Sequence, residues 1–438
     1  MQAAPVTLSG RLRYLGPGVV VAGSVIGSGE LILTTSLGAA VGFALLWFLL
    51  IACWSKSIVQ AELARLCILN RSTFLELFNT LPGKLPGRRK RVSWLVWYFF
   101  FSSLVVMFTA GGILGAATEG VLLLFPGSPR LGVAIGLTVL ASVVMGSGSY
   151  RLLEKLFLVM VLSFTVISVA CAAALYFSDL AVPISEVLSR QSFTFPVEYA
   201  PLIVAVFSYT GLNVGESIYY SYFCLDKGYA NHIGDSKSAE GIDRARGWMK
   251  VVNTDVWLTL FLLTAVTVPF YYLGAGVLHI SGSVPGNDDM ISIIGSVYVQ
   301  VMGPWIEPVF LLGAILVLYS TLLAWVGGDS RQVTDNLVEL GLLPNSPAVR
   351  KRWTRLIGYS WPFCFLALFW FFKSPLTLIV IGGISYALTG PLVVLGLLYL
   401  RRSKLPPELR SGNMATALLY LALCVMLVVG IGTIYFLF

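Results

Sequence analysis

The chain has 438 residues, of which 57% are hydrophobic and only 11% are charged, and its mean hydropathy is +0.85. Soluble domains carry roughly 25% charged residues, so this composition excludes a soluble globular protein and predicts an integral membrane protein. A net charge of +8 is compatible with nucleic-acid binding, but the distribution of the basic residues along the chain favours a different explanation.

Eleven stretches are apolar and long enough to cross a bilayer, at about 20 residues each. They lie near residues 17–40, 43–69, 94–124, 130–147, 152–177, 197–223, 249–276, 300–326, 356–372, 376–400 and 414–437. The longest polar connections are Leu225–Gly247 and Gly328–Arg355. This pattern predicts one all-α transmembrane domain of packed helices that spans residues 1–438, with the lipid bilayer as its main surroundings.

The first stretch, Gly16–Trp47, is interrupted where a spanning helix should be continuous. Gly27, Ser28 and a further glycine lead directly into Glu30, the only charged residue between positions 13 and 56. A charge at this depth costs a few kcal/mol and usually faces a cavity. Irregular backbone at membrane depth survives only inside protein or beside water, and broken helices mark the substrate sites of transporters. The segment therefore predicts a transporter.

A second interruption lies in Tyr209–Phe223, where Asn213 is followed by Gly215 and Glu216. The two interruptions begin successive blocks of five spans, which predicts an inverted repeat of residues 12–177 and 197–400, with helix 414–437 outside it. Because an odd number of spans gives the halves opposite orientations, we expect Glu30 and Glu216 to approach one cavity.

Basic residues gather on one side of the predicted topology. The even-numbered connections and the N-terminal tail collect clusters such as Lys84–Arg91 and Arg401–Arg410, whereas the opposite side receives only Arg130, Arg190 and Lys373. This positive-inside pattern predicts a cytoplasmic N-terminus and an external C-terminus in a bacterial inner membrane. The positive charge is therefore an orientation signal, no nucleic-acid partner is expected, and we expect a monomer.

Motifs for enzymes and cofactors are absent from the sequence. The six cysteines form no CxxC or Cys/His metal spacing, and no GxxxxGK[ST] loop for ATP occurs. Two histidines, His232 and His279, lie near or beyond span ends and supply neither a nucleophile nor a base. We therefore expect no enzymatic activity and no cofactor. Asp329 and Arg331 are expected to form an interfacial ion pair at the inner end of span eight.

Several motifs resemble the Nramp family of divalent-metal transporters. These are the GPG at Gly16–Gly18, the break eleven residues further on, the GF–LLW at Gly42–Trp47, Arg151 with Glu154, Asp255, and His279. The resemblance implies the LeuT-type fold, with a five-plus-five inverted repeat and interrupted helices one and six. It extends over the whole chain, and spacing carries most of it.

The functional positions of that family are changed here. Gly27–Glu30 align with its DPGN motif in the first span, and Gly215–Ser217 align with its MPH motif in the sixth. Ala110 and Ile113 align with an acidic pair that is associated with proton movement. Tyr222 aligns with a second histidine of the family, and Gly383 aligns with a glutamine. The resemblance thus implies a retained scaffold with rewritten metal and proton chemistry. It is similar to the divergent Nramp-related branch, parts of which are associated with magnesium.

A substrate site is predicted around the two interruptions. Its expected residues are Gly27, Ser28, Glu30, Asn213, Gly215, Glu216, Ser217 and Tyr222, with Glu30 and Glu216 as metal ligands. Carboxylates and water suit Mg²⁺, whereas sulfur ligands select softer metals. We therefore expect a secondary transporter that moves a small cation by alternating access, most simply hydrated Mg²⁺ and not Fe²⁺ or Mn²⁺.

Other cargoes and roles remain open at this point. An organic cation would pair with the same carboxylates and with the aromatic faces of Tyr209 and Tyr219–Tyr222. An amino acid would place its carboxylate at a half-helix N-terminus. An uncoupled facilitator needs no proton carriers. Alternatively, Glu30 and Glu216 only cap the ends of the broken helices.

Overall fold

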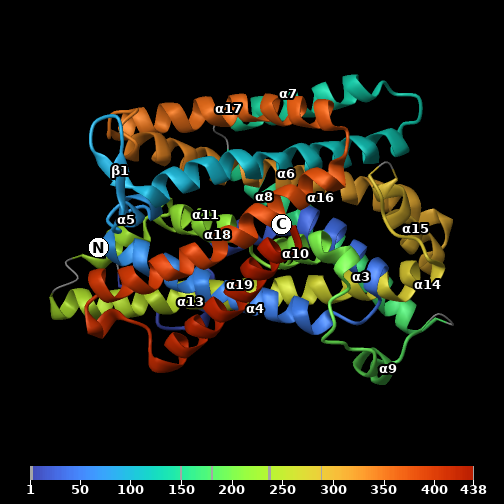
Figure 1. The fold of residues 1–438 in the computed structure, drawn as a ribbon, viewed down its shortest axis with the longest axis horizontal. Helices are drawn as coiled ribbons and strands as arrows, with labels where there is room; N and C mark the ends of the chain where they lie inside the picture. The colour runs from blue at the N-terminus through green and yellow to red at the C-terminus, as the bar shows by residue number, and fades with distance from the viewer. Residues whose placement is uncertain (1–2, 148–149, 179–180, 235–237, 288, 438) are drawn as a thin grey trace.

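The computed structural model describes residues 3–147, 150–178, 181–234, 238–287 and 289–437. The protein is a bundle of helices, and the described residues contain one short antiparallel hairpin in which Lys84 is paired with Ser93. The N-terminus, α5 (Phe74–Phe78) and the hairpin lie at one end of the bundle, and α9 (Ile184–Ser189) and α15 (Met290–Met302) lie at the other (Figure 1). We call the end with the hairpin the inner end, after the predicted orientation.

The first half of the chain contains α1 (Leu8–Leu12), α2 (Pro17–Val25), a π-helical segment (Ile26–Thr34), α3 (Thr35–Val41), α4 (Leu46–Asn70), α5 (Phe74–Phe78), β1 (Lys84–Pro86), β2 (Arg91–Ser93), α6 (Trp94–Leu124), α7 (Arg130–Ser147), α8 (Tyr150–Tyr176) and α9 (Ile184–Ser189). The second half contains a 3₁₀ turn (Val197–Tyr199), α10 (Ala200–Tyr209), α11 (Val214–Asp226), α12 (Tyr229–Ile233), α13 (Ala239–Leu273), a π-helical turn (Gly274–Leu278), α14 (His279–Ser281), α15 (Met290–Met302), a 3₁₀ turn (Pro304–Ile306), α16 (Glu307–Glu339), α17 (Pro347–Phe372), α18 (Pro375–Lys404), a 3₁₀ turn (Pro407–Leu409) and α19 (Asn413–Leu437).

These helices follow the predicted spans. Within the described part of the chain, nine helices are long and apolar enough to cross a membrane. The other two predicted spans are α7 and α8, in which the apolar stretches are the shorter ranges Arg130–Gly146 and Leu162–Tyr176. An integral membrane protein with an all-α fold is therefore confirmed.

The predicted extent of the two long polar connections is wrong, because helices continue into both of them. Helix α13 begins at Ala239, where the Ser238 hydroxyl accepts a hydrogen bond from the Gly241 N–H. Helix α16 extends to Glu339, and α17 begins at Pro347 behind a Ser346 cap. Serine caps of this kind start helices inside polar sequence, which hydropathy alone does not detect. Helix α15, in the connection before span eight, was also not predicted.

The interruptions of helices one and six take different forms. Helix one keeps its backbone hydrogen bonding through the π-helical segment Ile26–Thr34, whose residues are all buried. Helix six is unwound between Tyr209 and Val214, and Gly211 there has a φ of 65°, a conformation that favours glycine. We expected unwound backbone in both helices, but helix one forms wider, π-helical turns and is not unwound.

Helices one and six lie in the interior of the bundle. Helix α10 packs against α18 and the π-helical segment, and α11 packs against α4 and α16. Helices α7 and α17 lie together along one long side, with α13 and α19 on the opposite side (Figure 1). The unwound segment is thus surrounded by α4, α16 and α18, and these helices supply the side chains around it.

Candidate functional site

The unwound segment ends in a capping box at the start of α11. The Asn213 side chain accepts a hydrogen bond from the Glu216 N–H at 2.7 Å, and the Glu216 carboxylate accepts one from the Asn213 N–H at 3.0 Å. The other carboxylate oxygen of Glu216 accepts a hydrogen bond from the Ser24 hydroxyl at 2.8 Å. Glu216 therefore caps a helix N-terminus and joins helix six to helix one.

Glu30, in helix one, binds the backbone of the same unwound segment. Its side chain is 0% exposed. One carboxylate oxygen accepts a hydrogen bond from the Gly211 N–H at 2.9 Å, and the other accepts one from the Thr34 hydroxyl at 2.9 Å. A backbone N–H that unwinding leaves without a helical partner is thereby satisfied in the apolar interior.

Lys56 of α4 reaches the other end of the break, and sequence reasoning missed it. It is 1% exposed, and its ammonium donates hydrogen bonds to the carbonyls of Phe207, Ser208 and Thr210. These carbonyls close the C-terminal end of α10, where partial negative charge accumulates. The signal was available, because a lysine at the centre of an apolar span is as unusual as a glutamate.

The three charged groups interact across the break. Lys56 attracts both Glu30 and Glu216, and the two carboxylates repel each other. The structure thus brings Glu30 and Glu216 together, with Lys56 beside them. Each carboxylate already holds a backbone N–H, which is the arrangement expected of capping groups.

The remaining predicted site residues are divided between two places. The Gly27 N–H donates a hydrogen bond to the Thr321 hydroxyl at 3.2 Å, and Ser28 is buried beside it. The Ser217 hydroxyl donates to the Asn213 carbonyl at 3.1 Å. Tyr222 lies two turns further along α11, nearer the inner end, and is not beside the break.

A small cavity lies next to Gly215. Its volume of about 10 Å³ holds roughly one water molecule. It is lined by Phe99, Ser102, Ser103, Val106, Gly215, Ile218, Tyr219, Asp329, Gln332, Tyr386 and Thr389. The Tyr386 hydroxyl lies so close to Gly215 that an added Cβ would stand 2.1 Å from it. Glycine at this position therefore allows α18 to approach α11.

Asp329 is the charged group of this cavity. It is fully buried and accepts hydrogen bonds from the Tyr219 hydroxyl at 3.2 Å and the Trp361 indole N–H at 2.6 Å. The amide oxygen of Gln332 has no hydrogen-bond partner among the described residues, and that side chain is 6% exposed. The cavity thus combines a carboxylate that only neutral groups bind with an unpaired carbonyl oxygen.

The predicted ion pair between Asp329 and Arg331 is wrong. Arg331 instead pairs with Asp226 of α11, with 2.8 Å between its Nε and a carboxylate oxygen. Because α16 continues to Glu339, residues two positions apart point in directions about 200° apart around its axis. Asp329 consequently faces the bundle interior, and Arg331 faces the inner end.

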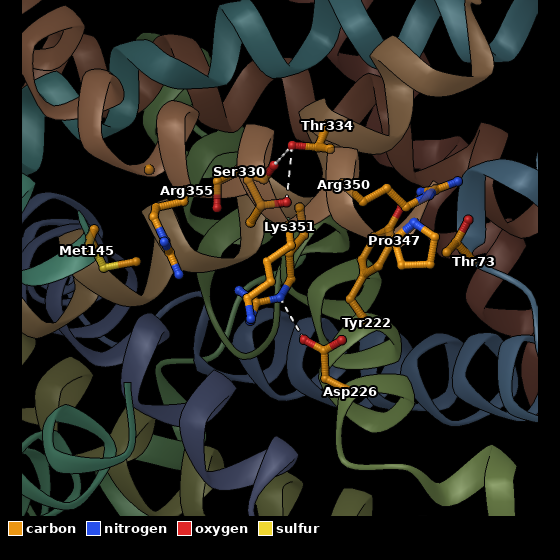
Figure 2. Close-up of a pocket in the computed structure, with 13 residues that line it drawn as sticks. Thr73, Met145, Tyr222, Asp226, Ser330, Thr334, Pro347, Arg350, Lys351 and Arg355 are labelled. Carbon is orange, nitrogen blue, oxygen red and sulfur yellow. Dashed lines mark hydrogen bonds and ion pairs between the residues drawn. The ribbon is translucent and has the colours of Figure 1, made fainter. Parts of the chain in front are cut away.

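A larger pocket opens towards the inner end, with a volume of about 470 Å³. It is lined by Thr73, Met145, Tyr222, Asp226, Ser330, Arg331, Thr334, Pro347, Arg350, Lys351, Thr354, Arg355 and Gly358. Figure 2 shows Tyr222 and Asp226 of α11 on one side of this space and Ser330 and Thr334 of α16 on the other. Helices α11 and α16 therefore line both the small cavity and the inner pocket.

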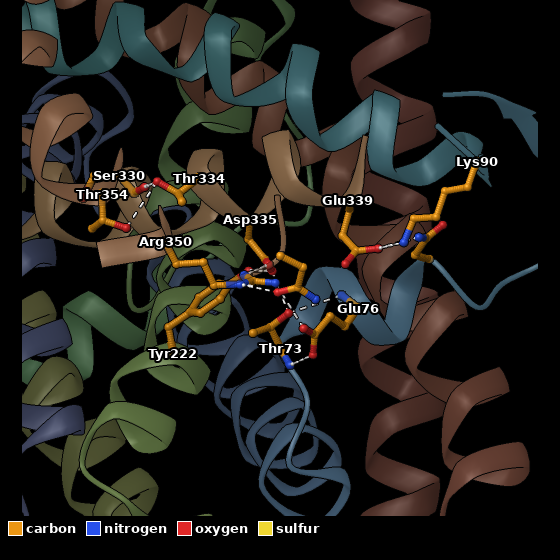
Figure 3. Close-up of polar contacts among 12 residues, drawn as sticks. Thr73, Glu76, Lys90, Tyr222, Ser330, Thr334, Asp335, Glu339, Arg350 and Thr354 are labelled. Carbon is orange, nitrogen blue, oxygen red and sulfur yellow. Dashed lines mark hydrogen bonds and ion pairs between the residues drawn. The ribbon is translucent and has the colours of Figure 1, made fainter. Parts of the chain in front are cut away.

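Ion pairs join α5, α16 and α17 beside that pocket. Arg350 pairs with Asp335 and with Glu76, while Lys90 pairs with Glu339 at 3.1 Å (Figure 3). The Tyr222 hydroxyl donates to Asp335 at 2.6 Å, which ties α11 to this cluster. Burial raises the pKa of the Glu76 carboxyl, and its hydrogen bond from the Thr73 N–H opposes this rise. The three carboxylates are thus held by bases, and the cluster fastens the inner end.

Other positions that carried the family resemblance have structural partners. Asp255 accepts hydrogen bonds from the Gly18 N–H at 2.9 Å and the Tyr220 hydroxyl at 3.0 Å, and His279 contacts the Ala39 carbonyl at 3.0 Å. The side chains of Arg151 and Glu154 lie outside the described residues. In α6, residues 110 and 113 are buried alanine and isoleucine, and residue 383 is a buried glycine of α18.

Sequence comparison decides the family. The model for Nramp, described as natural resistance-associated macrophage protein-like, matches residues 18–436. The chain belongs to this family. Comparison with curated proteins gives no match. Members of the Nramp family are membrane transporters and not enzymes, which supports the non-enzymatic reading of the sequence.

Solved structures share the fold. A manganese transporter of Eremococcus coleocola, in complex with an aromatic bis-isothiourea compound, aligns with a TM-score of 0.66 at 15% identity, over 98% of this chain and 88% of that chain. Mhp1, a nucleobase-cation-symport-1 family transporter in a closed conformation, gives 0.60 at 14% identity, over 96% and 91%. MhsT in complex with L-phenylalanine gives 0.54 at 14% identity, over 99% and 100%. The predicted LeuT-type fold of this Nramp protein is therefore confirmed.

Proposed function

We propose that this Nramp protein is a secondary transporter of a small, hard divalent cation such as Mg²⁺, which it moves by alternating access. The observation that carries the proposal is the chemistry of the cavity beside Gly215. Its described lining offers a carboxylate, an amide oxygen and several hydroxyl groups, and contains neither methionine nor cysteine. Oxygen ligands of this kind suit Mg²⁺, whereas thioether and thiolate ligands favour softer metals.

The charge around the break is consistent with a dication. Glu30, Glu216 and Asp329 carry three negative charges when ionised, and Lys56 returns one positive charge. With all three ionised, two negative charges lack a fixed counter-charge in the low-dielectric interior, and either bound protons or a mobile cation must compensate them. In this proposal Asp329 and Gln332 contact the cation, and Glu30 and Glu216 contribute to the attraction without contacting it.

Size and capping argue against the larger cargoes. A cavity of about 10 Å³ accommodates an ion or a water molecule but not an organic cation. An amino acid would need free N–H groups at the start of α11, and the Asn213–Glu216 capping box already uses that terminus. A hydrated ion would enter or leave when α11 and α16 separate towards the inner pocket.

The composition of α6 supports transport without proton coupling. The positions that resemble the family's acidic pair are Ala110 and Ile113, both buried and apolar, and the position that resembles its second histidine is Tyr222. The described part of α6 has one carboxylate, Glu119, which accepts hydrogen bonds from the N–H groups of Ile291 and Ser292 near the outer end. We propose that the gradient of the transported cation itself is the only driving force for its movement through this protein.

Uptake by purified protein in liposomes tests the proposal. We expect saturable Mg²⁺ uptake, measured with an internal Mg²⁺-sensitive dye, that an imposed pH gradient does not change. Asp329→Asn should remove most of this uptake, while Asp243→Asn, at an exposed position of α13, serves as the matched control. Uptake of an amino acid or an organic cation without any uptake of Mg²⁺ would contradict the proposal.

A further inference from the structure

Lys56 is bound in the way that a protein binds a free cation. Three backbone carbonyls, from Phe207, Ser208 and Thr210, converge on its ammonium group. Among the described residues, no carboxylate lies within 4.0 Å of this nitrogen. Carbonyl oxygens at unwound segments and half-helix C-termini are the ligands that transporters use for coupling cations. The ligand set at the end of α10 is therefore that of a cation site.

The surroundings of Lys56 fix its ammonium at this position. Cys53 and Lys56 lie three residues apart, on one face of α4, and both face the break. Close packing with Cys53 holds α4 against the unwound segment, because a Cβ added to Gly211 would stand 2.9 Å from the Cys53 backbone. The Phe207 ring lies 5.3 Å from the Lys56 nitrogen. The lysine stem thus enters from α4 and delivers its charge to carbonyls of buried residues.

We infer that Lys56 is a built-in substitute for a bound monovalent cation. Its ammonium fills the carbonyl site at the end of α10 permanently, so the break keeps its closed form without any dissociable ion there. A mobile cation is then excluded from this side of α11 by charge and by volume. The inference concerns the fixed charge alone and does not depend on which cargo the protein carries.

Truncation of the lysine exposes the site to free cations, which gives a direct test. We would purify the wild type, Lys56→Ala and Lys56→Met, and measure their melting temperatures in chloride salts of sodium, potassium, methylammonium and N-methylglucamine at equal ionic strength. Lys250→Ala, at an exposed position of α13, is the control for removal of a lysine. N-methylglucamine is too large for the vacated space and reports the unrescued state.

The wild type and Lys250→Ala should melt at the same temperature in every salt. Lys56→Ala should melt about 5 °C or more below the wild type in N-methylglucamine, because buried carbonyls lose their partner. A small cation should then restore much of that loss in a saturable manner, since binding stabilises by mass action. Lys56→Met fills the vacated volume without charge and should be destabilised in all salts equally.

Two results would overturn the inference. One is a Lys56→Ala protein as stable as the wild type in N-methylglucamine. The other is a destabilised protein that no small cation rescues beyond the N-methylglucamine baseline. If Lys56→Ala folds only when it is expressed and purified with a small cation, that requirement supports the inference. Mg²⁺ uptake by the wild type decides the proposed function separately, so either idea can fail alone.

Discussion

The two sides of α11 differ in how their buried polar groups are satisfied. On the side facing α4 and helix one, Lys56, Glu30 and Glu216 each hold backbone groups of the break. On the side facing α6 and α18, Asp329 is bound only by a tyrosine hydroxyl and an indole N–H, and Gln332 has an unpaired amide oxygen. The first side holds the backbone of the break, and the second leaves the amide oxygen of Gln332 unpaired.

This difference shows that a buried charge at a helix break can serve to cap the backbone that the break exposes. Glu30 and Glu216 were the most prominent residues of the sequence, and the structure gives them the partners of capping groups. Asp329 looked like an ordinary residue at a span end, and the structure places it at a cavity. Each of the three carboxylates accepts two hydrogen bonds. What distinguishes them is that Glu30 and Glu216 each bind a backbone N–H of the break, whereas both partners of Asp329 are side chains.

The largest expected effect is on the open side. Asp329→Asn keeps the size and one acceptor of the side chain but removes its charge, and we expect Mg²⁺ uptake to fall about 10–100-fold, as for loss of a metal ligand partner. The melting temperature should change little, because among the described residues no lysine, arginine or histidine side chain forms an ion pair with Asp329. Uptake in liposomes and thermal unfolding measure the two quantities. Unchanged uptake would place the cation elsewhere.

The inner end offers a matched pair of bases that sharpens the comparison. Arg350→Met should destabilise the protein by about 3–5 kcal/mol, because it leaves buried Asp335 without its counter-charge. Lys90→Met should cost no more than about 1 kcal/mol, because the Lys90 side chain is 54% exposed. Denaturation of the two variants in detergent provides the values. Equal losses would show that the ion pairs of this end act as one unit.

A smaller effect is expected on the closed side. Glu216→Ala removes one half of the capping box and should cost about 1–2 kcal/mol of stability, whereas Glu216→Gln keeps the acceptor and should cost less. Thermal unfolding of both variants distinguishes them. Should glutamine be as damaging as alanine, the charge of Glu216 matters more than its hydrogen bonds.

The smallest effect concerns pH at the inner end. The pKa of Glu76 is raised in the folded protein, mainly by burial. The folded state therefore binds this proton more tightly than the unfolded state, so the contribution of Glu76 to stability is full below the unfolded pKa and is lost as pH rises through the folded pKa. The melting temperature of the wild type relative to Glu76→Gln should fall slightly over the interval above the ordinary glutamate pKa of about 4.5. A difference that rises over this interval would contradict the assignment.

Much of the fold could be predicted from sequence because hydropathy and glycine placement report directly on spans and breaks. The boundaries of α6 and α7 match the predicted ranges 94–124 and 130–147. The inner ends of α13, α16 and α17 were missed, because they are polar helical turns that hydropathy reads as loops. That error moved Asp329 out of a helix and made its pairing with a near neighbour plausible.

The site was only partly predictable for a different reason. The sequence shows which charges are buried, but the partner of each charge depends on tertiary contacts. Lys56 reaches carbonyls more than 150 residues away, and Asp329 meets Tyr219 and Trp361 from two other helices. No periodicity within one helix encodes such pairs. A test of every charge within a span, lysine included, would nevertheless have added Lys56 to the candidate residues.

The π-helical segment Ile26–Thr34 allows helix one to become longer without adding residues. A π-helix closes each hydrogen bond over one more residue than an α-helix does, so it takes up more residues per unit of axial distance. Conversion of this segment to α-helical bonding would lengthen helix one and rotate Glu30 about the helix axis. During this conversion nearly every backbone N–H would change its hydrogen-bond acceptor from one carbonyl to the next one along the chain. Helix one can therefore change its reach inside the bundle without presenting bare peptide groups to an apolar interior.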